Sequence, residues 1–176
     1  MPRRVFSGRL SAAIAGAAAL AALAATTSPA ATAAATPRCA TSGLVIWLET
    51  QGNGALGSIY YNLDFTNLSG HACTLVGYPG VSAVNLGGHT LGSAASRDNS
   101  HAPVVVTLAA GATARAVLRI VEAGNFPASA CREVTAAGLR VFPPGQTASK
   151  VVPFPFQTCS RAGQSVLSVR AVALQA

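Results

Sequence analysis

Methionine and histidine are scarce in this chain of 176 residues, which limits the metal sites that it can form. The only methionine is the initiator, and the three histidines, His71, His89 and His101, form no H-x-H or H-E-x-x-H pair. All three stand among glycine, serine, asparagine and aspartate, which is typical of surface loops. A copper carrier would need clusters of methionine and histidine, so we expect no metal site and no cofactor.

Acidic residues are also few, and their scarcity limits hydrolytic chemistry. The five are Glu49, Asp64, Asp98, Glu122 and Glu133. A glycosidase needs two converging carboxylates, and no spacing in the sequence identifies such a pair. The nucleophile elbow G-x-S-x-G is missing as well, because Gly163-Gln164-Ser165 lacks the closing glycine. We therefore expect no catalytic residue and no enzyme activity, with a hydrolase that uses an unrecognised site as the alternative.

The chain has no dense run of basic residues, although its twelve lysines and arginines outnumber the five acids. Three of the arginines precede residue 10, so nine basic residues remain beyond them against five acids, a net charge of +4. Nucleic-acid binding would need a basic patch or stripe, and we expect none. An alternative that stays open is a binder of anionic wall polymer or lipid through exposed Arg115, Arg119 and Arg140.

The N-terminal residues have the pattern of an export signal. Arg3, Arg4 and Arg9 precede an apolar run, Ser11–Ala25, which is too short and too rich in alanine for a membrane span. Arg3-Arg4-Val5-Phe6 resembles a twin-arginine motif, so we expect export by either the Sec or the twin-arginine route.

Cleavage is expected close to residue 33. Ala31-Thr32-Ala33 fits the cleavage pattern, with cuts after Ala30 or Ala35 as alternatives. A lipoprotein would carry small residues directly before a cysteine, whereas Pro37-Arg38 precedes Cys39, so we expect no lipid anchor. The expected organisation is a signal peptide at 1–33, a flexible lead-in at 34–38 and a single domain at 39–176.

Beyond residue 39, apolar and polar residues alternate at the period of β-strands, and no amphipathic helix is evident. In Ser58–Thr66 the odd-numbered residues are apolar and share one face, opposite Asp64, which we expect to be solvated. In Ala114–Val121 the even-numbered residues are expected inside, with Arg115 and Arg119 outside. The other expected strands are Leu44–Glu49, Cys73–Val76, Val81–Leu86, Pro103–Leu108, Gly138–Phe142, Val151–Phe156 and Val166–Ala173.

Glycine and proline motifs separate these strands. Tyr78-Pro79-Gly80-Val81 predicts a type II turn with Gly80 at positive φ, and Gly52-Asn53-Gly54 predicts a turn after the first strand. Further turns are expected at Gly87-Gly88, Ala110-Gly111 and Pro143-Pro144-Gly145. Eight or nine short strands with turns roughly every 8–12 residues favour an antiparallel β-sandwich.

Two prolines alternate through Val151–Phe156. Neither Pro153 nor Pro155 has an N–H to donate to a β-ladder. We therefore expect this segment at the edge of a sheet, where the prolines also discourage pairing with another chain.

Four cysteines, Cys39, Cys73, Cys131 and Cys159, all follow the export signal. An even set in an exported protein indicates two structural disulfides. Three pairings are possible, and we favour the sequential one, Cys39–Cys73 with Cys131–Cys159. The wide separation of the cysteines argues against the close C-x₂₋₄-C pairs of a zinc site.

Two other features have both a structural and a functional interpretation. If Trp47 faces solvent, it could form an aromatic platform with Tyr60, whereas we favour a position that caps the core near a disulfide. Asn67-Leu68-Ser69 matches a glycosylation sequon. We instead expect a turn there, in which Asn67 and Ser69 bond the local backbone.

The stretch Y-N-L-D-F-T-N-L-S at 61–69, followed by C-T-L-V-G-Y-P-G-V at 73–81, resembles an actinobacterial secreted family called domain of unknown function 4232. The resemblance continues through 104–111, Cys131, L-R-V at 139–141 with Pro143-Pro144, and Cys159, so it covers the chain from about Cys39 to the C-terminus. It implies an immunoglobulin-like β-sandwich in the cell envelope or outside the cell, with no assigned catalytic residue. Ala110 departs from the pattern, because proline often precedes the turn glycine there.

Together these features predict an all-β protein: an antiparallel immunoglobulin-like β-sandwich of about eight strands, stapled by two disulfides after a cleaved signal peptide. The expected function is that of a secreted, non-catalytic binding or structural module of the bacterial cell envelope. Its partner would be an unknown protein or cell-wall component. We expect no nucleic-acid partner and no transmembrane anchor after cleavage.

Overall fold

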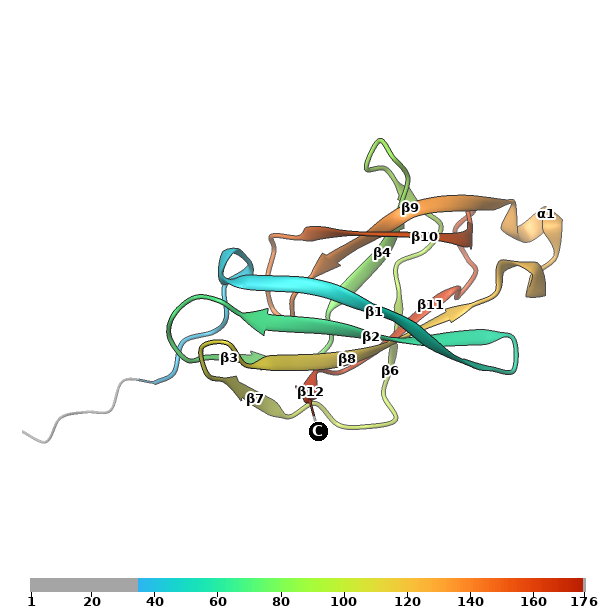
Figure 1. Cartoon of the computed structure of the whole chain (residues 1–176). Coiled ribbons are helices and arrows are strands. Elements are labelled where there is room, and N and C mark those ends of the chain that lie inside the picture. Colours follow the sequence, from blue (N-terminus) through green and yellow to red (C-terminus); the bar gives the residue numbers. More distant parts are fainter. Residues whose placement is uncertain (1–34, 176) are drawn as a thin grey trace, which may run out of the picture. The chain divides into compact units, whose positions relative to one another are not determined.

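A computed structural model describes residues 35–175 of the chain (Figure 1). The predicted signal peptide at 1–33 lies outside the described residues. Within the part that is described, no helix is both long and apolar enough to cross a membrane. The whole β-rich domain lies in one compact unit, Ala34–Ala176.

Twelve β-strands form three sheets in the described residues. The largest sheet has the order β1-β2-β8-β11-β6, with β12 also paired to β8; the second has the order β10-β9-β4-β5, and β3 pairs with β7. The strands of the largest sheet are β1 (Leu44–Ala55), β2 (Ser58–Asn67), β6 (Ser96–Asp98), β8 (Thr113–Val121), β11 (Leu167–Arg170) and β12 (Ala173–Leu174). The others are β3 (Cys73–Val76), β4 (Gly80–Val84), β5 (Thr90–Leu91), β7 (Val105–Leu108), β9 (Glu133–Phe142) and β10 (Lys150–Cys159).

The two larger sheets enclose one hydrophobic core (Figure 1). The alternation in β8 buries every second residue, including Ala116, Leu118 and Ile120, as the sequence predicts. In β2, Leu63 and Phe65 are fully buried on the same face. The prediction of an all-β sandwich stapled by two disulfides is therefore confirmed.

The strand count and one pairing differ from the prediction. β5 and β6 contain only two and three residues, too few to show an alternation that sequence reasoning can detect. β6 pairs with β11 in parallel, whereas all the strands were expected to be antiparallel. β9 begins at Glu133, five residues before its expected start, and continues the ladder with β10.

Two predicted turns are wrong. Gly52-Asn53-Gly54 lies inside β1, where a β-bulge shifts the register, and the chain reverses at Leu56-Gly57 with both φ angles positive, 47° and 70°. Gly80 opens β4, and the positive φ occurs at Gly77 instead, at 100°. Glycine motifs therefore marked the right regions without fixing which residue takes the left-handed conformation. The turns at Gly88, Gly111 and Gly145 have positive φ as expected.

Residues 37 and 38 belong to the fold, so the predicted flexible lead-in at 34–38 is wrong at its C-terminal end. Arg38 forms an isolated parallel bridge with Thr74, and the backbone N–H of Thr74 donates to the Pro37 carbonyl at 2.8 Å. This pairing sets Cys39 beside Cys73.

Edge strands β1 and β10 lie on the same side of the sandwich and contact each other. The prediction that the two prolines mark an edge strand is confirmed, because β10 ends the order of its sheet. Thr41, in the short helix η1 (Thr41–Gly43), donates its hydroxyl to the Ala148 carbonyl at 3.1 Å, and the Lys150 ammonium donates to the Leu44 carbonyl. These bonds tie the two sheets together across this side.

Candidate functional site

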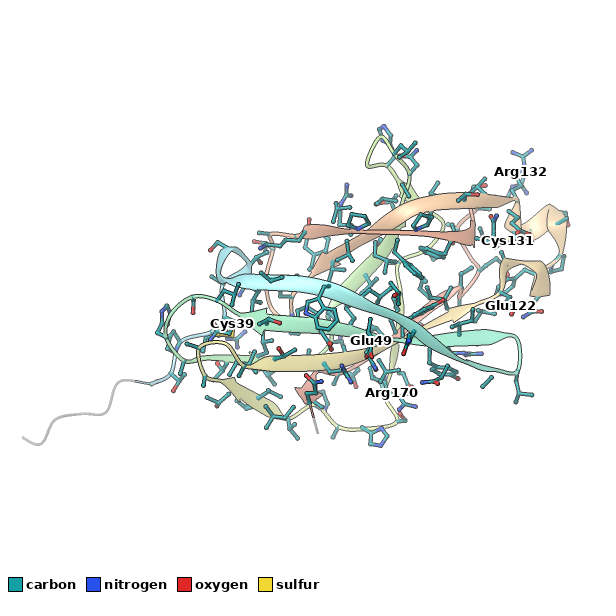
Figure 2. All side chains as sticks on the ribbon, in the orientation of Figure 1. Cys39, Glu49, Glu122, Cys131, Arg132 and Arg170 are labelled. Atoms are coloured by element: carbon teal, nitrogen blue, oxygen red, sulfur yellow. A yellow bond between two sulfur atoms is a disulfide. The ribbon has the colours of Figure 1, made fainter. Side chains whose placement is uncertain are left out.

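The four cysteines form the two predicted disulfides, Cys39–Cys73 and Cys131–Cys159, with Cα–Cα distances of 4.9 and 4.5 Å. Figure 2 shows Cys39 and Cys131 at opposite ends of the sandwich. The first bond joins the segment before η1 to β3. The second joins α1 (Ala128–Cys131) to the end of β10. All four sulfur atoms are buried in scaffold, so they supply no reactive thiol.

Asp64 is buried, and the prediction of a solvated carboxylate is wrong. Its side chain is 0 % exposed although it points to the outer face of the large sheet. Arg115, opposite it on β8, donates Nε to Oδ1 at 2.8 Å and Nη2 to Oδ2 at 2.9 Å. The alternation of polar and apolar residues located the face correctly but could not show that a guanidinium covers it.

Glu49 completes a charged cluster on this outer face. Its Oε2 lies 3.2 Å from Arg115 Nη2 and accepts a hydrogen bond from Asn62 Nδ2 at 2.8 Å. The hydrogen bond to Asp64, followed by the charges of Asp64 and Glu49, raises the pKa of the Arg115 guanidinium. The cluster has two carboxylates for one guanidinium, so it offers no positive charge to a ligand.

The three arginines of the anionic-ligand hypothesis do not form one patch. Arg115 is paired with carboxylates, and Arg119, on the same sheet, donates Nε to the Ser58 hydroxyl at 3.0 Å. Arg140 belongs to β9 in the other sheet, where it donates Nη2 to the Gly88 carbonyl at 2.6 Å. A polyanion could not contact all three arginines on a single face.

Trp47 lies on the outer face and is 42 % exposed, so the prediction that it caps the core is wrong. Its Nε1 donates to the Thr66 hydroxyl at 3.3 Å. Trp47 is opposite Asp64 on β2, four residues from Tyr60, a separation of about 13 Å along the strand. The Glu49–Arg115 cluster occupies the space between them, so Trp47 and Tyr60 form no common platform.

The histidines are exposed, as expected, and one of them contacts a serine. Ser100 Oγ lies 3.0 Å from His101 Nδ1 in the turn after β6. A catalytic triad also needs an acid that orients the imidazole, but Asp98 accepts from the backbone N–H of Ser100 and pairs with Arg170 at 3.0 Å. No cluster of three metal-ligating side chains occurs in residues 35–175.

Asn67 confirms the predicted turn and is its buried centre. Its Nδ2 donates to the carbonyls of His71, Leu108 and Ala109 at 2.8, 3.1 and 3.1 Å. Its Oδ1 accepts from the backbone N–H and the hydroxyl of Ser69. The side chain is inaccessible in the folded domain, so the sequon has a structural role.

A groove with mainly apolar walls runs along β12, and we call it the flank groove. It has a volume of about 490 Å³, within the range of ligand sites. Val104 and Leu174, which are 59 % and 62 % exposed, line it together with Arg115 and Arg170. Sequence reasoning missed this site because it joins the segment before β7, strand β8 and the C-terminal residues.

The second arginine of the flank groove, Arg170, is also paired with a carboxylate, that of Asp98. Hydrogen bonds from Ser100, followed by that from Arg170, lower the pKa of Asp98 to about 2. Both guanidiniums at the groove therefore already face carboxylates. The surface is suited to apolar contact with a polar rim, which is the usual composition of a protein-binding surface.

Comparison with protein families gives one match. The family model described as "Domain of unknown function (DUF4232)" matches residues 39–173, which include both disulfides and all of the flank groove except Leu174 and Gln175. No curated protein and no solved structure matches the chain.

Proposed function

The chain belongs to the DUF4232 family, and from this premise we propose that it is an exported, non-catalytic binding module of the bacterial cell envelope. The observation that carries the binding role is the flank groove: exposed apolar side chains gather around a recess that nothing in the described residues covers. Apolar residues that gather in this way commonly mark interaction surfaces.

The disulfides support the compartment. Structural disulfides persist in oxidising environments outside the cytoplasm and are rare inside it. Here both bonds lie within one small domain, and the sequence before the domain has the pattern of an export signal. A braced scaffold of this kind keeps a binding surface fixed without a bound partner.

The neutralised arginines favour a protein partner over an anionic polymer or lipid. Arg115 and Arg170 both face carboxylates, so the flank groove has apolar walls and no excess positive charge. Binding through apolar contact should change little with salt, whereas binding of a polyanion should weaken as salt screens the charges. The salt dependence of capture therefore separates the two proposals.

A photo-crosslinking amino acid at Val104 tests the proposal on living cells. Val104 is exposed, so the substitution leaves the core intact. We expect one defined envelope component to be captured, and the added substitution Leu174→Glu to abolish that capture. A crosslinker at Leu86, an exposed residue of the β4–β5 hairpin, is the matched control. Equal capture from both positions, or bulk protein alone, would contradict the proposal.

The hydrolase alternative is tested with the purified protein. Ser100 would have to be the nucleophile if the serine–histidine contact were catalytic. A fluorophosphonate that labels activated serines, and panels of peptidase, esterase and glycosidase substrates, should all give no reaction. Labelling at Ser100 that Ser100→Ala removes would establish an enzyme instead.

A further inference from the structure

A second cavity lies between the two larger sheets, at the end of the domain that carries the Cys131–Cys159 bond. We call it the end recess; its volume is about 360 Å³. It opens between β2 and β8 of the large sheet and β9 and β10 of the other sheet. Its lining residues include Ile59, Tyr61, Ile120, Glu122, Glu133 and Phe156. Figure 2 shows Glu122 at this end of the domain, beside the loop that leads to Cys131.

One wall of the end recess is aromatic and held in place by packing. The rings of Tyr61 and Phe154 meet edge to face with centroids 5.0 Å apart, and Phe154 stacks on Phe156 at 5.8 Å. Pro153 and Pro155 alternate with the two phenylalanines of β10 and are exposed, so Phe154 and Phe156 share the inner side. Burial raises the pKa of the Tyr61 hydroxyl, which therefore stays neutral at physiological pH.

The rim of the end recess carries the two carboxylates that the rest of the fold leaves without an ion pair. Glu49, Asp64 and Asp98 are all paired with Arg115 or Arg170. Among residues 35–175, Glu122 and Glu133 form no ion pair, and both line the end recess. No basic residue lines it. The end recess is thus locally acidic on a chain whose basic residues outnumber its acids.

We propose that the end recess binds an organic cation: an ammonium group carried on an apolar body. The carboxylates of Glu122 and Glu133 complement the positive charge of the ammonium group. The rings of Tyr61 and Phe156 contact the apolar body, and their faces attract the cation. An ammonium over an aromatic ring within about 6 Å is attracted by the ring's quadrupole. A bare metal ion would gain nothing from the aromatic wall. This inference rests on the proposed function, because it gives the binding module one class of ligand.

The test uses phenethylammonium as the probe and 2-phenylethanol as its neutral counterpart. Each is titrated into the purified domain that begins at residue 34, with amide shifts followed by NMR. We expect the ammonium probe to shift residues of the end recess and to bind at least about tenfold more tightly than the alcohol. Raising the salt concentration should weaken the binding of the ammonium probe and leave the binding of the alcohol unchanged.

Matched variants distinguish the effect of the two carboxylates in the end recess from the effect of the net charge of the domain. The double substitution Glu122→Gln with Glu133→Gln should lower the affinity for the ammonium probe about tenfold or more and leave the affinity for the alcohol unchanged. Asp98→Asn removes a charge of the same sign from a strand that does not line the recess, and should leave binding unchanged. Phe156→Leu should weaken the binding of both probes, because it removes one ring of the aromatic wall. The amide spectra of each variant show directly whether the domain remains folded.

Three results would overturn the inference. They are equal affinity for the two probes, unchanged binding in the double glutamine variant, and no shift with probe at concentrations on the order of 50 mM. Preference for a neutral sugar over both probes would count against it in the same way. Capture of an envelope component through Val104 does not depend on Glu122 or Glu133. The proposed function can therefore stand when this inference fails.

Discussion

Arg115 holds the carboxylate of Asp64 through two parallel hydrogen bonds, Nε to Oδ1 at 2.8 Å and Nη2 to Oδ2 at 2.9 Å. The pair lies on the outer face of the large sheet, yet Asp64 has no exposed surface. A buried carboxylate is stable only while its partner remains, because the desolvation cost of the charge is otherwise uncompensated. This relationship makes Arg115 part of the scaffold.

Replacing Arg115 with methionine should therefore destabilise the domain by about 3 kcal/mol, since it leaves Asp64 buried and unpaired. The double variant Arg115→Met with Asp64→Leu should recover most of the loss. Urea denaturation of both variants measures the difference. Glu49→Gln is the control, because Glu49 is more exposed and its removal should cost less than about 1 kcal/mol. A single variant as stable as the wild type would refute the structural role of the pair.

Leu56 offers a stabilising substitution. It occupies the first corner of the two-residue β1–β2 turn at φ 47°, with its side chain fully in solvent. Such turns favour asparagine followed by glycine, so Leu56→Asn should raise the free energy of unfolding by about 1 kcal/mol. Leu56→Ala keeps the unfavourable φ and should bring little gain. A lower melting temperature for the asparagine variant would show that Leu56 has contacts beyond the turn.

Asn67 should be among the most sensitive polar positions of the fold. Asn67→Ala removes three donated and two accepted hydrogen bonds in a buried site, with an expected loss on the order of 3 kcal/mol. Ser69→Ala, which removes one hydroxyl from the same turn, should cost much less. Thermal unfolding of the two variants gives the comparison, and equal losses would contradict the central place of Asn67.

The Asp98–Arg170 pair predicts a specific response to acid. The pKa of Asp98 is lowered to about 2 in the folded state, against about 3.9 in an unfolded chain. Its contribution to stability is therefore complete above about pH 4 and is lost as the pH falls toward 2. The wild type should exceed Asp98→Asn in stability above pH 4, with a difference that narrows toward pH 2. A difference that stays constant across this range, measured by denaturation at each pH, would contradict the assignment.

The fold was predictable wherever alternation or turn chemistry acted over a few neighbouring residues. The pattern of Ala114–Val121 and the prolines of β10 identified an inner face and a sheet edge correctly. The true β1–β2 turn at Leu56 was not predicted, because Gly52 and Gly54 stand four and two residues earlier and leucine rarely takes positive φ. The strands β5 and β6 are too short to carry a pattern.

The candidate sites could not be predicted from the sequence, for a different reason. Glu122 and Glu133 are separated by the loop that contains α1, and only the fold brings them to one cavity with Tyr61 and Phe156. The alternation in β2 cannot distinguish a solvated Asp64 from one covered by Arg115. Both features depend on contacts between distant segments, which a single sequence does not specify.

We propose that this domain works outside the cytoplasm as an oxidised, processed protein. Intact-mass measurement of the natural protein, recovered from the medium and the cell envelope without reducing agent, tests it most directly. We predict a chain that begins at Ala34, or at Ala31 or Thr36 if one of the alternative sites is cut, and that lacks four hydrogens relative to its reduced mass, because both disulfides are formed. An unprocessed chain in the cytoplasmic fraction with four free thiols would contradict it.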